Sequence, residues 1–187
     1  MPKSGKSINR EISISSREIY RGKIVSLRLD KVRSTLSGRE TEREIVEHSQ
    51  AVAIVPVDNS GNVILVRQFR KAAERELLEI PAGSIEEFEK PEIAARRELH
   101  EETGFTAGRL LPLGGFWNSP GFCTEYMYAF LALDLKVGQA EPDDDEAIEI
   151  EFVSLGEIPD LIKAGKFQDA KSISCLLLVL NFYKNEL

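Results

Sequence analysis

The chain has 187 residues, of which 42% are hydrophobic and 29% charged, so a disordered or fibrous protein is excluded and a folded domain with a sizeable core is predicted. Its 24 basic and 31 acidic residues leave a formal net charge of −7, which argues against a general nucleic-acid binder. Two cysteines cannot supply a disulfide framework, the N-terminus lacks the apolar stretch of a secretory signal, and no apolar run is long enough to cross a membrane. We therefore expect a cytoplasmic protein with neither nucleic-acid nor membrane partners.

The N-terminal quarter of the chain predicts a flexible end followed by strands. Residues 1–16 are polar and without periodicity, so we expect them to be flexible and the ordered structure to begin near Ile19. Residues 24–33 mix apolar and charged side chains as an exposed strand does, residues 34–39 are expected to turn, and a further short strand begins at Ile45. We assign residues 17–48 to an N-terminal β region.

The centre of the predicted core is the apolar run Ala51–Val57, which is typical of a strand covered on both faces. The turn formers at 58–61 join this run to the apolar residues 63–66, and we expect the two segments to form a β-hairpin. After another apolar segment, Pro81-Ala82-Gly83 interrupts the pattern.

Helical signals follow this interruption. Residues 91–103 are predicted to form a helix because Pro91 suits its first turn and Gly104 suits its C-terminal end. Strands are expected at 126–133 and 148–152, separated by an acidic loop, and helices at 155–164 and 170–184. The alternation predicts a single mixed α/β domain over residues 49–187.

Three glutamates gather on one face of the predicted helix. Glu98, Glu101 and Glu102 are spaced i, i+3 and i+4, which places their side chains within an arc of roughly 100°. Such crowding of like charges costs a few tenths of a kcal/mol per pair in an isolated helix. Hard oxygen ligands on one face suit Mg²⁺ or Mn²⁺, and the lack of nearby His or Cys argues against zinc. The alternative is a solvated acidic face.

Two further features favour the metal-binding interpretation. The Pro81-Ala82-Gly83 segment could supply a loop carbonyl as another oxygen ligand. Arg97 could pair with Glu101 or Glu89 and so hold the carboxylates in place.

The stretch from Gly83 to Phe105 resembles the Nudix box. Its defined positions, Gly, five residues, Glu, seven residues, Arg-Glu-aliphatic, one residue, Glu-Glu, one residue, Gly-aliphatic, correspond to Gly83, Glu89, Arg97, Glu98, Leu99, Glu101, Glu102, Gly104 and Phe105. Only Phe105 departs from the pattern, because it stands where the family has an aliphatic residue. The resemblance implies an α/β/α sandwich with a mixed sheet, preceded here by the N-terminal β region.

The resemblance also implies metal-dependent cleavage of a nucleoside diphosphate. It makes Glu98, Glu101, Glu102 and the carbonyl of Ala82 the expected ligands of Mg²⁺, with Mn²⁺ as an alternative, and it implies catalytic roles for Arg97, Glu98 and Glu102. Pyrophosphate cleavage requires cations that neutralise phosphate oxygens and help a water to lose a proton, so the expected ligands and the expected reaction agree.

Four segments outside the box resemble the branch of the family that acts on ADP-ribose and nucleoside diphosphate sugars: REIVEH at 43–48, VRQFR at 66–70, LLEIPAG at 77–83 and SPGF at 119–122. Pro120 also follows Gly104 by the sixteen residues found in that branch. The resemblance then covers most of residues 17–184.

Several substrate-binding residues follow from this likeness. Arg70 could hold a phosphate with its planar guanidinium, Glu125 could meet sugar hydroxyls or metal-bound water, and Gly121 with Phe122 could line the substrate. In each case a structural role is the alternative: a surface ion pair for Arg70, core packing for Phe122 and a simple turn at Pro120-Gly121.

The acidic loop supplies the expected general base. Residues 143–146 resemble a mobile loop of this branch, and Glu146 is our choice for the carboxylate that accepts a proton from the attacking water. Glu102 is the alternative base, and a solvated acidic turn is the alternative role for the loop.

Members of this branch usually form homodimers in which N-terminal strands help the partner to bind the base, a role that here would fall to Ile24, Arg43 and Glu44. The expected reaction is metal-dependent hydrolysis of ADP-ribose or a related sugar nucleotide to a nucleoside monophosphate and a sugar phosphate. Two alternatives remain open: cleavage of another diphosphate, such as a dinucleotide coenzyme or a modified nucleoside triphosphate, and a catalytically silent nucleotide-sugar sensor.

Overall fold

The structure is a computed structural model that describes residues 10–138 and 148–187. The chain divides into two compact units. The first unit comprises the chain up to Ser49 together with Ser119–Glu125, and the second comprises Gln50–Asn118 and Tyr126–Leu187.

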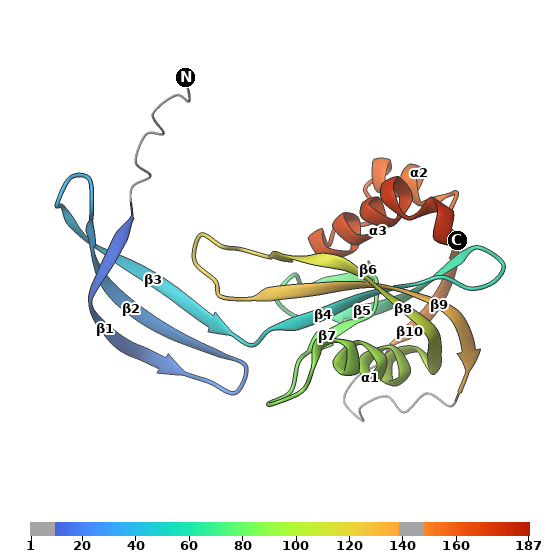
Figure 1. Cartoon of the computed structure of the whole chain (residues 1–187), viewed down its shortest axis with the longest axis horizontal. Coiled ribbons are helices and arrows are strands. Elements are labelled where there is room, and N and C mark those ends of the chain that lie inside the picture. The colour runs from blue at the N-terminus through green and yellow to red at the C-terminus, as the bar shows by residue number, and fades with distance from the viewer. Residues whose placement is uncertain (1–9, 139–147) are drawn as a thin grey trace, which may run out of the picture. The chain divides into compact units, whose positions relative to one another are not determined.

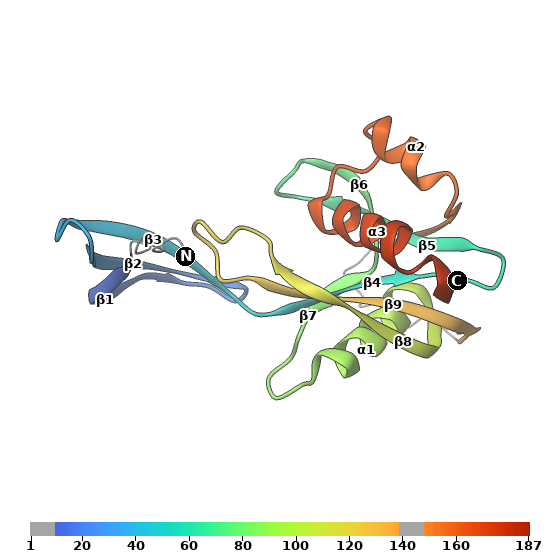
Figure 2. The ribbon, with the colours of Figure 1, turned by 45° about the horizontal axis from the view of Figure 1, so that its top comes forward.

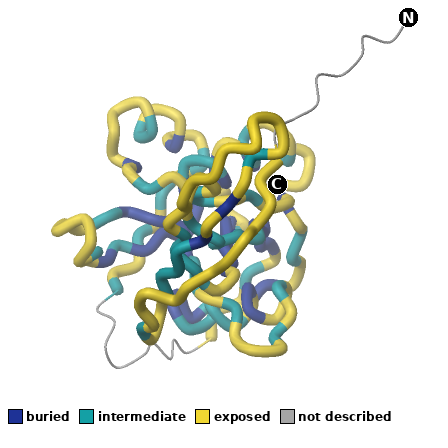
Figure 3. The backbone as a smooth tube through the Cα atoms, turned by 90° about the vertical axis from the view of Figure 1, so that its left-hand side faces the viewer, coloured by how far each residue is buried: buried dark blue, intermediate teal, exposed yellow. Residues whose placement is uncertain are grey.

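The first unit is built on an antiparallel sheet in the order β1-β2-β3, formed by β1 (Glu11–Arg21), β2 (Val25–Ser34) and β3 (Glu40–His48). Strand β1 is exposed along its whole length, and Figure 3 shows the chain in the exposed colour where it leaves the grey N-terminal trace. The segment 119–125 joins the end of β3, where the Val46 amide donates to the Phe122 carbonyl at 2.8 Å.

The second unit contains a mixed four-stranded sheet in the order β7-β4-β9-β8 (Figure 1). Strand β4 (Ala51–Pro56) runs parallel to β9 (Tyr126–Val137), and the pairings with β7 (Ala82–Ser84) and β8 (Phe105–Trp117) are antiparallel. A second antiparallel sheet has the order β10-β5-β6, formed by β10 (Glu149–Ser154), β5 (Asn62–Arg70) and β6 (Arg75–Glu79). The predicted mixed sheet is confirmed.

Helices lie on both sides of the four-stranded sheet. Helix α1 (Pro91–Thr103) covers one face, and α3 (Ala170–Phe182) covers the other, with α2 (Ile158–Lys163) near it (Figures 1 and 2). A short 3₁₀ turn, η1 (Lys184–Glu186), follows α3. The predicted α/β/α sandwich is thereby confirmed, and no helix in the described residues is long and apolar enough to span a bilayer.

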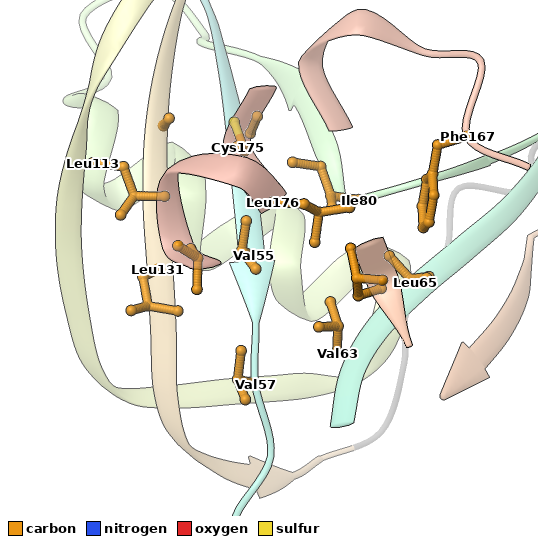
Figure 4. Close-up of a cluster of buried hydrophobic side chains, with 14 of the residues drawn as sticks. Val55, Val57, Val63, Leu65, Ile80, Leu113, Leu131, Phe167, Cys175 and Leu176 are labelled. Carbon is orange, nitrogen blue, oxygen red and sulfur yellow. The ribbon is translucent and has the colours of Figure 1, made fainter. Parts of the chain in front are cut away.

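Strand β4 separates two hydrophobic cores. Val52 and Ile54 point to the core under α1, where they meet Ala94 and Leu99. The alternate residues of β4, such as Val55, belong to the larger core under α3, together with residues of β5, β6, β9 and α3 (Figure 4). Every residue of β4 is buried, as the continuous apolar run predicts.

Three expectations about the elements are wrong. Order begins earlier than Ile19, because Glu11–Arg21 form strand β1, in which serines alternate with isoleucines without a buried face. The predicted hairpin is limited to a turn and one bridge between Val57 and Val63, because β4 and β5 belong to different sheets. Helix α2 is also shorter than the predicted 155–164.

Strand β8 was not foreseen from the sequence. Its thirteen residues include Gly108, Pro112, Gly114 and Gly115, which interrupt the alternation that predicts a strand. The structure accommodates them with a register shift between Pro112 and Gly114, and Gly114 adopts a φ of 104°. The glycines and the proline at this β-bulge therefore explain why the sequence pattern did not predict the long strand.

Candidate active site

Helix α1 presents the box glutamates from a well-defined position. Pro91 lies in its first turn, and Gly104 ends it with a φ of 72° while its N–H donates to the His100 carbonyl. Both ends are as predicted, because proline suits the first turn and glycine adopts positive φ without steric cost. The helix packs on β4 through Ala94, Ala95 and Leu99, which turns its glutamates toward β7 and the loop before it.

Arg97 is the centre of this site. Its Nε and Nη2 donate to the two carboxylate oxygens of Glu89 at 3.1 and 2.9 Å, and its Nη1 donates to both Glu98 and Glu101 at 2.8 and 2.9 Å. Nη2 also donates to the Ser84 carbonyl at 3.0 Å. The predicted pairing of Arg97 with Glu101 or Glu89 is present with both, and one guanidinium holds three carboxylates and a loop together.

The hydrogen bonds between Arg97 and Glu89 shift the pKa of both side chains. The pKa of Arg97 lies above its ordinary value, first because of the hydrogen bonds to Glu89 and then because of the Glu98 and Glu101 carboxylates, which outweigh its partial burial. The pKa of Glu89 lies below its ordinary value, first because Arg97 donates to it and also because the Glu86 amide does. Arg97 and Glu89 are therefore both fully charged at neutral pH.

Strand β7, which precedes α1, approaches the glutamates closely. A Cβ built on Gly83 would lie 2.0 Å from the Glu98 carboxyl carbon, so only glycine lets this carboxylate lie against the backbone. One residue earlier, the Ala82 amide donates to Glu102 Oε2 at 3.2 Å. The carboxylates of Glu98 and Glu102 thus both lie against β7, and the Ala82 carbonyl, expected as a loop ligand, belongs to this short strand.

The oxygen atoms of these glutamates and of the Ala82 carbonyl are the type of ligand that a hard divalent cation prefers. Carboxylate oxygens and backbone carbonyls are the ligands that Mg²⁺ and Mn²⁺ prefer, and the glycine at position 83 leaves space for Glu98 beside the loop. In the described part of the chain, no three His, Cys, Asp or Glu side chains are already grouped closely enough to hold a metal ion.

Arg70, the expected phosphate ligand, lies at the end of β5 and forms a two-point ion pair with Glu79. Its Nε and Nη2 donate to Glu79 Oε1 and Oε2 at 2.9 and 2.8 Å. The Glu79 side chain is only 1% exposed, whereas Arg70 is 39% exposed. The sequence did not single out Glu79, although a glutamate inside the apolar segment LLEIPAG is a signal of a buried ion pair.

The remaining expected substrate residues belong to the first unit. Ile24 is exposed between β1 and β2, and Arg43 and Glu44 lie on β3, where Arg43 is paired with Glu11 at 2.5 Å. Gly121, Phe122 and Glu125 lie in the segment 119–125, with Phe122 exposed rather than in the core. Glu125 Oε1 lies 3.9 Å from His48 Nδ1.

The structure therefore brings together Ala82, Arg97, Glu98, Glu101 and Glu102 within the second unit. Glu146, the expected general base, lies outside the described residues.

Comparison with known proteins identifies the family of this chain. The model of the NUDIX domain matches residues 47–174. Among curated proteins, an ADP-ribose pyrophosphatase of Bacillus subtilis is 42% identical over 164 residues, covering 87% of this chain and 88% of that protein. A methanol dehydrogenase activator of Bacillus methanolicus is 36% identical over 165 residues, covering 87% and 89%.

A solved structure extends the likeness to the fold. A crystal structure described as an ADP compounds hydrolase superimposes with a TM-score of 0.87 at 26% identity, covering 97% of this chain and 98% of that chain. The box residues on α1, their contacts with the loop at Gly83 and the match over residues 47–174 lead to one conclusion: this chain belongs to the NUDIX family.

Proposed function

We propose that this protein is a metal-dependent pyrophosphatase that cleaves ADP-ribose and related nucleoside diphosphate sugars to a nucleoside monophosphate and a sugar phosphate. The observation that supports this most is the set of carboxylates that Arg97 holds beside the Ala82-Gly83 loop. The likeness to proteins named for ADP-ribose and ADP compounds supports the choice of substrate class.

The metal would be Mg²⁺, with Mn²⁺ as an alternative, held by Glu98, Glu101, Glu102 and the Ala82 carbonyl. When bound, a divalent ion neutralises the non-bridging phosphate oxygens and lowers the pKa of a nearby water. Arg97 holds Glu98 and Glu101, and the Ala82 amide holds Glu102, so the carboxylates would have to move toward one another to coordinate a single ion.

The other residues have roles in binding and proton transfer. Arg70 binds a phosphate, and Gly121, Phe122 and Glu125 contact the sugar side, with Ile24, Arg43 and Glu44 at the base. Glu146 accepts the proton from the attacking water, with Glu102 as the alternative. The reaction adds a hydroxyl to one phosphorus atom and breaks its bond to the bridging oxygen, which leaves with the other phosphate.

The test is product analysis with purified protein and Mg²⁺. ADP-ribose, UDP-glucose, GDP-mannose, NADH and dGTP are incubated with the protein, with and without EDTA. We expect metal-dependent release of AMP and ribose phosphate from ADP-ribose. Cleavage of NADH or dGTP alone would favour another diphosphate, and binding without cleavage of any compound would favour a sensor.

Two variants examine the carboxylate site directly. Glu98→Gln and Glu102→Gln should each lower kcat by about a hundredfold or more, because each removes a charged ligand while keeping the side-chain shape. Glu92→Gln is the matched control, since Glu92 is exposed in the first turn of the same helix. Unchanged turnover in both site variants would contradict the proposed metal site.

We also propose a homodimer formed through the N-terminal strands. Apolar side chains on β1, including Ile12, Ile14 and Tyr20, are exposed, and a sheet edge with exposed apolar residues requires a partner. Sedimentation velocity at micromolar concentration should give twice the chain mass of 20.9 kDa. Ile14→Asp should yield the monomer and Ser13→Asp should not, whereas a wild-type monomer would contradict the proposal.

A cytoplasmic location is part of the same proposal, supported by the two cysteines, neither of which forms a disulfide. Cell fractionation followed by immunodetection tests it.

A further inference from the structure

A buried network of ion pairs lies at the start of α3, outside the Nudix box. Lys171 donates from Nζ to Glu79 Oε2, the same carboxylate that holds the Arg70 guanidinium in a two-point pair. Nζ of Lys171 also donates to Asp169 Oδ2 at 2.9 Å. Two basic and two acidic side chains thus form one connected group that links β5, β6 and α3.

This network is costly to bury. The Lys171 side chain is 10% exposed and that of Glu79 is 1% exposed. Both charged groups are therefore buried next to the apolar residues at the end of β6. Burial alone would raise the pKa of Glu79, but the hydrogen bonds and charges of Arg70 and Lys171 outweigh it and leave the pKa below its ordinary value. Replacing such groups by apolar side chains often costs no stability, so a buried ionic network is better explained by the geometry that it fixes.

The geometry concerns the Arg70 guanidinium. Nε and Nη2 are both engaged by Glu79, which fixes the plane of the group. Among the described residues, none forms a hydrogen bond with Nη1, and the side chain is accessible enough for an anion to reach it. The pKa of Arg70 is raised first by its hydrogen bonds to Glu79, and the charge of Glu102 contributes, so Arg70 lies within electrostatic reach of the carboxylate site.

The same turn of α3 also holds the loop before the Nudix helix. Asp169 caps α3 by accepting from the Ser172 amide at 3.0 Å, and it accepts from Ser172 Oγ at 2.6 Å. Ser172 Oγ in turn accepts from the Ile80 amide at 2.9 Å. Ile80 lies two residues before Ala82, whose amide donates to Glu102. Both Arg70 and the Ala82 loop are therefore fixed by one helix end.

We propose that Glu79 and Lys171 are positioning residues that hold Arg70 as a preformed phosphate-binding arm, before any metal arrives. This rests on the proposed function in that the ligand is a nucleoside diphosphate sugar. Lys171 itself does not touch the substrate, because it is buried and its charge is taken up by Glu79 and Asp169. Its effect on binding passes through Arg70.

The experiment is calorimetric titration of ADP-ribose into the metal-free full-length protein in EDTA at low salt. Lys171→Met should weaken binding about fivefold to tenfold, and Arg70→Ala by at least as much. The double variant should bind as Arg70→Ala does, within about twofold, because coupled residues are not additive. Lys171→Arg should restore most of the affinity, and Lys163→Met, an exposed lysine on α2, should bind as wild type does.

A second variant and a separate readout keep the outcomes distinct. Glu79→Gln should weaken binding as Lys171→Met does, which covers the case in which Lys171→Met does not fold. Absent binding by the metal-free wild type, or an equal loss from Lys171→Met with and without Arg70, would overturn the proposal. Turnover of the wild type is measured separately with Mg²⁺: binding without cleavage would reject the proposed function and leave the positioning roles intact.

Discussion

At Gly83, the lack of a side chain allows the Glu98 carboxylate to lie against the loop backbone. The constraint is steric rather than conformational, because a Cβ there would meet all three carboxyl atoms of Glu98 at 2.0–2.2 Å. Arg97 holds the same carboxylate from the other side through Nη1. The Glu98 carboxylate is therefore held between the Gly83 backbone and the Arg97 guanidinium.

Gly83→Ala should lower kcat/KM for ADP-ribose by about a hundredfold, because a displacement of about 1 Å at a reacting site can cost that much. The free energy of unfolding should fall by less than for overpacking in a core, because the Cβ would meet only the far end of the Glu98 side chain, which can shift. Steady-state kinetics and urea unfolding measure the two effects.

The matched control is Gly156→Ala, since a Cβ on Gly156 would lie at an ordinary contact distance of 3.7 Å from Ser154 Oγ and Gly156 has no positive φ. That variant should keep wild-type kinetics and stability. Wild-type activity in Gly83→Ala would show that the close approach of Glu98 to the loop is not needed for the reaction.

At the scale of elements, helix α1 depends on its C-terminal end. Gly104 has a φ of 72°, its N–H donates to the His100 carbonyl, and its own carbonyl accepts from the Gly138 amide at 2.7 Å. Residues with a Cβ pay a steric cost in this region, and the next strand, β8, begins at Phe105.

Gly104→Ala should therefore reduce the free energy of unfolding by about 1 kcal/mol. Urea denaturation followed by far-UV circular dichroism measures this loss, with Gly156→Ala again as the control. An unchanged midpoint would mean that the end of α1 relaxes without cost.

The sequence predicted α1 well and strands β1 and β8 poorly, for physical reasons. Pro91, Gly104 and the glutamate spacing are local signals, and the structure places both helix ends where they indicate. Strand β1 has no buried face, and β8 has its alternation broken by glycines and Pro112, so neither left a periodic pattern. The pairing of β4 with β9 rather than β5 depends on contacts about 75 residues apart along the chain, which no local pattern encodes.

In the candidate site too, contacts between sequence neighbours were predictable from the sequence, and contacts between distant residues were not. Arg97 and Glu101 are one turn apart on a helix, so spacing alone predicted their contact. Lys171 and Glu79 are 92 residues apart, and nothing near Lys171 in the sequence marks it as the partner of a buried glutamate.

At the scale of the whole molecule, the buried and clamped carboxylates couple stability to pH. The pKa of Glu79 lies below its ordinary value because Arg70 and Lys171 outweigh the effect of burial, and that of Glu89 does because of Arg97. A carboxyl whose pKa is lower in the folded state contributes stability above its unfolded value of 4.5. This contribution is lost as the pH falls through the folded value.

The urea midpoint should therefore be steady near neutral pH and fall as the pH drops below about 4.5, the unfolded carboxyl value. Glu79→Gln should unfold at a lower urea concentration at pH 7 and show a shallower decline in acid. A wild-type midpoint that does not change between pH 6 and 3 would contradict the linkage.

Strand β4 contributes side chains to two hydrophobic cores, one on each face of the sheet. Only one register of β4 places side chains of the right size in both cores. Ala51, Ala53 and Val55 face the core under α3, whereas Val52 and Ile54 face the core under α1. A slip of one residue would exchange the two sets, placing branched side chains where alanines fit and leaving voids beneath α1. The unequal sizes on the two faces thus guard against misalignment during folding, and they keep the Ala82-Gly83 loop, paired with β4 at Ala53 and Val52, opposite the Nudix glutamates.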